Sequence, residues 1–203
     1  MFRAFVLAAG LAALSVPAIA APAIGQPAPA FQVKDADGKT RSLAEFKGKT
    51  VVLEWTNEGC PYVQKHYNSG NMQGLQRQAA NDGMVWLTVI SSAPGMQGYK
   101  EPAEAKAWKA KAKAAPAAVL LDPDGKVGRA YDAKTTPHMY IVDKAGKLVY
   151  MGGIDDRPSA DPGSLKGAKN YVTAALADVK AGRAVSQAAT KPYGCSVKYG
   201  SAD

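Results

Sequence analysis

The stretch Thr50-Val51-Val52-Leu53-Glu54-Trp55-Thr56-Asn57-Glu58-Gly59-Cys60-Pro61 decides the fold. Its first half is β-branched and apolar apart from Glu54, which predicts a buried central strand. Pro61 favours the first position of a helix, so we expect the chain to pass from strand to helix at Cys60. The thiol of Cys60 would then lie at a helix N-terminus, where free backbone N–H groups and the helix dipole stabilise a thiolate.

Strand and helix patterns alternate on both sides of this stretch. A helical segment connects it to the next apolar strand, which predicts a parallel strand pair with a right-handed crossover. The order of elements predicts one α/β domain with a mixed sheet, followed by a tail without periodicity. The expected strands are residues 31–34, 50–55, 84–90, 118–121, 138–142 and 147–151, and the expected helices are residues 61–67, 72–80, 102–114, 126–131 and 164–181.

The N-terminus has the features of an export signal. Arg3 precedes an apolar run at residues 5–14 that is short for a membrane span, and Ala18-Ile19-Ala20 offers small residues to a signal peptidase. We therefore predict cleavage after Ala20 and a periplasmic or secreted protein without stable membrane insertion; an uncleaved anchor is the alternative. The expected division is a signal peptide at 1–20, the α/β domain at 21–182 and the tail at 183–203.

The charge and the cysteine count narrow the function classes. The formal net charge is +8, but the densest lysine cluster, around Trp108, is typical of a solvated helix face and not of a nucleic-acid site. No nucleic-acid partner is expected. The two cysteines, Cys60 and Cys195, form no C-x-x-C pair and no zinc-finger spacing. A reactive pair and a structural staple both remain open.

Three motifs resemble the thioredoxin superfamily, and within it the redoxin branch that includes the AhpC/TSA proteins. They are Gly59-Cys60-Pro61 after its strand, Thr136-Pro137 before a strand, and the turn at 143–147. The chain is most similar to exported peroxiredoxin-like proteins with W-T-N-x-x-C-P-Y-V, here residues 55–63, and G-C-S-x-K, here residues 194–198. The resemblance implies a thioredoxin-like fold with a central mixed sheet flanked by helices, an N-terminal β-hairpin and a C-terminal tail.

The sequence also departs from the family patterns. Thioredoxin-type reductases carry a second cysteine three positions after the first, where this chain has Val63. True peroxiredoxins carry a threonine three positions before the reactive cysteine and a proline earlier, where this chain has Asn57 and Leu53. Oxidation within a C-x-x-C motif is therefore excluded, and the peroxide-activating residues are missing.

Three residues are the candidates for catalysis. Cys60 is expected to be the nucleophile, since a thiolate is the attacking species in disulfide exchange. Glu54 would be buried with a raised pKa and would exchange a proton with the cysteine; the alternative is that it faces water. Cys195 would resolve a mixed disulfide on Cys60, form a permanent staple with it, or remain an unpaired thiol.

The resemblance also implies a substrate-binding surface. Thr136-Pro137 matches the cis-proline of the family, which turns the preceding backbone toward an extended substrate and keeps metal away from the cysteine. Pro61 and Trp55 are expected to contribute to the same surface. His66 and His138 would lie near Cys60, and these three residues are weak copper candidates, so we expect neither a metal nor another cofactor.

Three functions follow as hypotheses. The leading one is an exported thiol–disulfide oxidoreductase that acts on protein or small-molecule thiols and disulfides. The second is a thiol peroxidase with antioxidant activity, in which Cys60 is oxidised to a sulfenic acid. The third is a non-enzymatic copper-binding or chaperone-like module with a structural Cys60–Cys195 disulfide. Asp155-Asp156 is interpreted only as a turn or helix-entry feature.

Overall fold

The structure is a computed structural model that describes residues 21–201. The predicted signal peptide lies outside the described residues. Within residues 21–201, no helix is both long enough and apolar enough to cross a bilayer.

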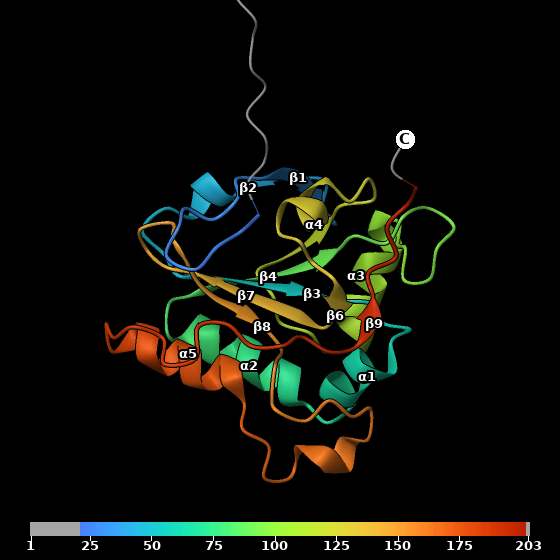
Figure 1. Cartoon of the computed structure of the whole chain (residues 1–203). Helices are drawn as coiled ribbons and strands as arrows, with labels where there is room; N and C mark the ends of the chain where they lie inside the picture. Colours follow the sequence, from blue (N-terminus) through green and yellow to red (C-terminus); the bar gives the residue numbers. More distant parts are fainter. Residues whose placement is uncertain (1–20, 202–203) are drawn as a thin grey trace, which may run out of the picture.

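A seven-stranded mixed sheet forms the centre of the molecule, in the order β2-β1-β5-β4-β3-β7-β8 (Figure 1). As predicted, β3 pairs in parallel with β4, and it pairs antiparallel with β7 on its other side. The predicted N-terminal hairpin, β1 and β2, forms one edge. The strands are β1 Gln32–Asp35, β2 Thr40–Ser42, β3 Val51–Trp55, β4 Val85–Ile90, β5 Ala118–Leu121, β7 His138–Val142 and β8 Leu148–Gly152.

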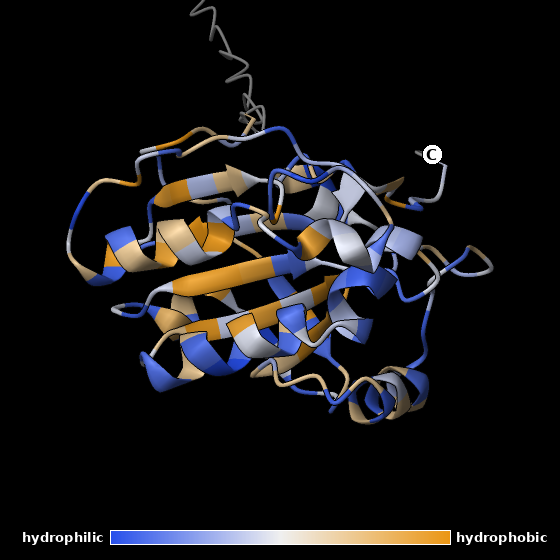
Figure 2. Cartoon of the chain, turned by 90° about the horizontal axis from the view of Figure 1, so that it is seen from below, coloured by the Kyte–Doolittle hydropathy of each residue, from blue (hydrophilic) through white to orange (hydrophobic). Residues whose placement is uncertain are grey.

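Helices cover both faces of this sheet, and each face has its own apolar core. Alternating residues of β3 point to opposite sides, so Val52 packs in one core and Leu53 in the other. Figure 2 shows apolar strands behind helices whose outer faces are hydrophilic. The helices are α1 Pro61–Asn68, α2 Asn71–Asn81, α3 Pro102–Lys111, α4 Lys126–Ala130 and α5 Tyr171–Lys180, with 3-10 turns at Leu43–Phe46 and Pro162–Leu165.

The closing helix begins later than the sequence pattern predicts. We expected a helix over 164–181, but α5 begins at Tyr171 and only a 3-10 turn precedes it. Gly167 has a φ of +72°, a left-handed conformation that interrupts a helix. Asn170 then caps α5, because its side chain accepts a hydrogen bond from the backbone N–H of Thr173 at 2.9 Å.

The tail returns along the body of the molecule, in red in Figure 1. Its short strand β9, Cys195–Ser196, pairs antiparallel with β6, Thr135–Thr136. The sequence indicated no structure here. This pairing brings the tail cysteine to the loop that precedes Pro137.

Candidate functional site

Cys60 lies where β3 leads into α1, as the sequence predicts. It is the N-cap residue of α1, with an extended backbone, and Pro61 occupies the first helical position. The side chain of Cys60 is fully buried, at 0% exposure. Its Sγ lies 3.1 Å from the carbonyl oxygen of Thr136 and 2.6 Å from Sγ of Cys195. The helix terminus, the loop and the tail therefore converge on one sulfur atom.

The loop before β7 positions both cysteines. The Thr136–Pro137 bond is cis, as the resemblance implied. Thr136 pairs with Cys195 across the β6–β9 bridge, and its hydroxyl donates to the carbonyl oxygen of Cys195 at 3.4 Å. Of the predicted site residues, the structure thus brings Cys60, Cys195, Thr136 and Pro137 together. Pro61 is exposed beside them.

The two thiols have different electrostatic surroundings. Burial raises the pKa of Cys60, but hydrogen bonds from the Cys195 thiol and from the backbone N–H of Val63 outweigh it, and the net pKa is lowered. Burial, together with the neighbouring Cys60 sulfur, raises the pKa of Cys195 to about 11. Cys60 is therefore the thiol that ionises first.

A buried polar cluster anchors the tail just before Cys195. The hydroxyl of Tyr193 donates to Oδ1 of Asp155 at 2.5 Å and accepts from Nζ of Lys65 at 3.1 Å. His66 Nε2 lies 3.2 Å from the same hydroxyl. Lys65, His66 and Asp155 are almost completely buried. The sequence pattern did not predict this cluster: it indicated only a turn or helix-entry feature at Asp155 and a weak copper candidate at His66.

A second tyrosine anchors the tail after Cys195. The hydroxyl of Tyr199 donates to the carbonyl oxygen of Ala133 at 2.7 Å, and Arg129 stacks over the ring. The ring packs so closely on α4 that a Cβ on Gly128 would lie 2.4 Å from its hydroxyl oxygen. The tail is therefore fastened on both sides of its cysteine.

Glu54 is buried on β3, which confirms that part of the sequence prediction. Its carboxylate accepts hydrogen bonds from the side chains of Tyr67 at 2.7 Å, Trp86 at 2.8 Å, Thr88 at 3.0 Å and Gln76 at 3.2 Å. Burial nevertheless raises the pKa of Glu54. Among the described residues it has no hydrogen bond to Cys60, and Tyr67 links it to α1.

Trp55 does not reach the site. It is fully buried in the core on the other side of the sheet from Cys60, where it packs on Tyr131 and Tyr140. Its indole N–H donates to Oγ of Ser91 at 3.0 Å. Trp55 is therefore a core residue and is not available to contact a substrate.

Both histidines are buried and already hydrogen-bonded. His66 Nδ1 lies 2.8 Å from Nδ2 of Asn71, and His138 Nδ1 accepts a hydrogen bond from the backbone N–H of Lys134 at 3.2 Å. Burial lowers the pKa of each to about 4. In residues 21–201, no group of three or more His, Cys, Asp or Glu side chains could hold a metal ion.

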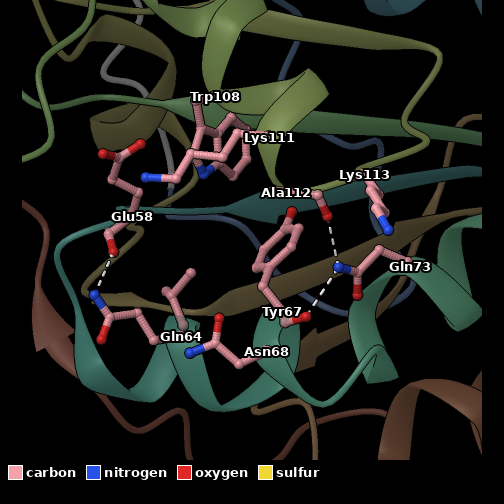
Figure 3. A pocket seen from close by; sticks show the side chains of 10 residues that line it. Glu58, Gln64, Tyr67, Asn68, Gln73, Trp108, Lys111, Ala112 and Lys113 are labelled. Carbon is pink, nitrogen blue, oxygen red and sulfur yellow. Dashed lines mark hydrogen bonds between the residues drawn. The ribbon is translucent and has the colours of Figure 1, made fainter.

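An open pocket of about 490 Å³ lies between α1 and α3 (Figure 3). Tyr67 and Trp108 are in edge-to-face contact at 5.4 Å and form part of its apolar lining. Gln73 donates to the carbonyl oxygens of Tyr67 and Ala112, which joins the two sides. Cys60 does not line this pocket, so it does not open onto the thiols.

Comparisons with known proteins give a family and a fold. The AhpC/TSA family matches residues 24–151. Thiol-disulfide oxidoreductase ResA of Bacillus subtilis (strain 168) is 28% identical over 129 residues, 60% of this chain and 63% of ResA. The chain thus matches less than two thirds of the length of this curated relative.

Two solved structures agree on the fold. A hypothetical protein from Sinorhizobium meliloti 1021 superposes with a TM-score of 0.77 at 24% identity, covering 90% of this chain and 98% of that one. The thioredoxin domain of a thiol-disulfide oxidoreductase from Bacteroides vulgatus superposes with a TM-score of 0.51 at 26% identity, covering 64% and 87%. The predicted thioredoxin-like fold and redoxin resemblance are confirmed.

Proposed function

Because the chain belongs to the AhpC/TSA family, within the thioredoxin superfamily, we propose that it is a thiol–disulfide oxidoreductase. It cycles the Cys60–Cys195 pair between two thiols and an internal disulfide. The observation that carries the proposal is the 2.6 Å separation of the two sulfurs, which belong to residues 135 positions apart in the chain. No disulfide-forming partner for Cys60 exists three positions later, where Val63 stands.

Cys60 is the nucleophile in this cycle. Its thiolate attacks a substrate disulfide, forms a mixed disulfide with one substrate sulfur and releases the other as a thiolate. Cys195, after losing its proton, attacks Sγ of Cys60 and releases the second substrate thiol. The substrate gains two electrons, and the protein loses two by forming the Cys60–Cys195 bond. Two equivalents of an external thiol later reduce the Cys60–Cys195 disulfide to two thiols and are themselves oxidised to an external disulfide.

The surrounding residues support these steps. Thr136 and Pro137 are buried under the tail, where Thr136 pairs with Cys195, so we propose that an extended substrate would lie along them only after the tail moves aside. Pro61 is exposed beside them. Glu54 is proposed as a buried proton acceptor for the cycle, because burial raises its pKa. Asn57, in the place of a peroxidase threonine, instead accepts a hydrogen bond from the backbone N–H of Gly59 at 2.9 Å. This geometry favours disulfide exchange over peroxide reduction.

The cycle needs a compartment in which disulfides form. We propose that residues 1–20 direct export to such a compartment, and that 21–182 and 183–203 act together there as domain and tail.

The test is a thiol titration of the mature protein in glutathione buffers of graded potential, with Cys60→Ser and Cys195→Ser as comparison variants. We expect two thiols in the reduced wild type, none after mild oxidation, and turnover of a peptide disulfide that Cys60→Ser abolishes. A disulfide that resists reduction until urea unfolds the protein would identify a structural staple instead. Two thiols at every potential would also refute the cycle.

A further inference from the structure

The two sulfurs of the proposed pair are not equally accessible. Cys60 has no exposed surface, whereas Cys195 is half-buried at the surface of the tail. Cys60 is enclosed by α1, by the loop at Thr136 and by Cys195 itself. A reagent that approaches the protein while the tail is in place therefore contacts Cys195 before Cys60.

The part of the tail that covers Cys60 is anchored on both sides of Cys195. Before Cys195, Tyr193 is bonded to Asp155 and Lys65 inside the molecule. After Cys195, Tyr199 is bonded to Ala133. An internal disulfide would add a covalent tie in the middle. In the oxidised state, the tail is thus fixed over Cys60 at three points.

From this geometry we propose that an external thiol reduces the oxidised protein by attacking Sγ of Cys195, with Cys60 as the leaving group. The inference rests on the proposed function and assigns a different sulfur to each partner. A substrate disulfide reacts with Cys60 once the reduced tail has moved aside. The reducing thiol reacts with Cys195 while the tail is still in place.

The step balances as an ordinary disulfide exchange. The incoming thiolate bonds to Sγ of Cys195, the Cys60–Cys195 bond breaks, and its electron pair leaves on Sγ of Cys60. A second external thiolate attacks the external sulfur of the mixed disulfide, so that an external disulfide forms and Cys195 leaves as a thiolate that takes a proton from water. The external thiols lose two electrons and the protein gains two.

The electrostatics of the site favour this direction. A thiol with a lower pKa leaves faster in disulfide exchange. Burial raises the pKa of both cysteines, but the hydrogen bond from the backbone N–H of Val63, which lowers the pKa of Cys60, persists when Cys195 is bonded to the incoming thiol. The positive charge of Lys198 acts on Cys195 and would attract an incoming thiolate. Exposure, leaving-group quality and local charge therefore all point to Cys195 as the point of attack.

Rapid-quench peptide mapping tests the proposal. The oxidised wild-type protein is mixed with reduced glutathione, quenched with acid at several early times and digested, and the glutathione adduct is located by mass spectrometry. Extrapolated to zero time, we expect at least tenfold more adduct on Cys195 than on Cys60. Equal amounts, or an excess on Cys60, would overturn the proposal. A disulfide that glutathione leaves intact in the folded protein would instead refute the proposed function on which it rests.

A pair of hydroxyl deletions tests whether the anchored tail causes the selectivity. Tyr193→Phe removes the hydroxyl bonded to Asp155 and should lower the Cys195-to-Cys60 adduct ratio at least threefold, because a looser tail exposes Cys60. Tyr62→Phe is the control, since Tyr62 packs on the Tyr193 ring but its hydroxyl has no hydrogen bond within residues 21–201. An unchanged ratio in Tyr193→Phe, with the wild-type ratio in the control, would contradict shielding by the tail.

Discussion

A Cβ atom on Gly194 would lie 2.0 Å from the carbonyl oxygen of Thr136. The tail backbone thus passes the loop before Pro137 with no room for a side chain. Gly194 also has a φ of +132°, which other residues rarely adopt. Because Cys195 follows directly, this close approach sets the position of its sulfur beside Cys60.

Gly194→Ala should separate the two sulfurs. The added methyl group would push the tail away from Thr136, and we expect the equilibrium constant for forming the internal disulfide against glutathione to fall at least tenfold. Overpacking of this kind costs about 1–3 kcal/mol of folding free energy. Gly74→Ala is the control: a Cβ there meets nothing within 4 Å, and alanine favours a helix by about 0.5–1 kcal/mol. A wild-type equilibrium constant in Gly194→Ala would show that the close approach of Gly194 to Thr136 does not position Cys195.

Asp155→Asn should destabilise the fold far more than Asp156→Asn. Asp155 is buried, with Oδ2 3.7 Å from Nζ of the buried Lys65, and its Oδ1 accepts from Tyr193. Removing one partner of a buried ion pair typically costs about 3–5 kcal/mol, because the other charge is left without compensation. Burial already lowers the pKa of Lys65, and removing the Asp155 charge, which raises it, would lower it further.

The neighbouring Asp156 is the matched control for this substitution. It is exposed and pairs only with Arg157 at 3.4 Å among the described salt bridges, so its replacement should cost less than about 1 kcal/mol. Urea unfolding of both variants measures the difference. Equal stabilities would show that the cluster does not hold the tail to α1.

The sequence predicted the elements that have a long, regular pattern. The apolar runs of β3 and β4 and the junction at Cys60–Pro61 determine the central parallel pair and the helix N-terminus. By contrast, β9 has two residues, which is too short to show any period. Its pairing with β6 depends on a chain reversal that no local pattern encodes.

The buried cluster escaped prediction for a different reason. Lysine is almost never fully buried unless it is paired, so a lysine and a histidine on α1 are normally interpreted as surface residues. The partner of Lys65 and His66 lies on another segment, and Tyr193 is a further 38 residues from Asp155 along the chain. The role of Asp155 is therefore evident only from its contacts with Tyr193 and Lys65 in the folded structure.

His66→Gln should reduce the loss of stability in acid. Burial lowers the pKa of His66 to about 4, against 6.5 when unfolded, so between these values the unfolded chain binds more protons. The contribution of neutral His66 is therefore complete above pH 6.5 and is lost as the pH falls toward 4. For this shift, the wild type should lose about 2 kcal/mol through His66 between pH 7.5 and pH 5.

Urea unfolding at both pH values measures this dependence. Glutamine does not titrate, so the variant should lose about 2 kcal/mol less than the wild type on acidification. His138 has a similarly lowered pKa of about 4, and His138→Gln should have an effect of the same sign. If the double variant His66→Gln/His138→Gln loses as much stability on acidification as the wild type, neither imidazole stays neutral in the folded state.

Glu54→Gln should change both stability and the pH profile of disulfide exchange. The raised pKa of Glu54 means that the folded state holds its proton more tightly than the unfolded chain. Its stabilising contribution is complete below the ordinary carboxyl pKa and is lost as the pH rises through the folded-state value. Glutamine cannot titrate, so the stability of the wild type relative to Glu54→Gln should decrease with rising pH.

The rate of exchange at Cys60 separates a proton-transfer role from a structural one. If Glu54 takes up the thiol proton, Glu54→Gln should remove one titration from the pH–rate profile and slow exchange roughly tenfold to a hundredfold near neutral pH. Thr88→Val is the control, because it removes one hydrogen bond to Glu54 at 3.0 Å and keeps the acid. It should lower stability by about 1 kcal/mol and keep the titration of Glu54 in the profile, shifted to higher pH because the lost hydrogen bond had lowered the pKa of Glu54. An unaltered profile in Glu54→Gln would make Glu54 a residue that only joins β3 to α1 through Tyr67.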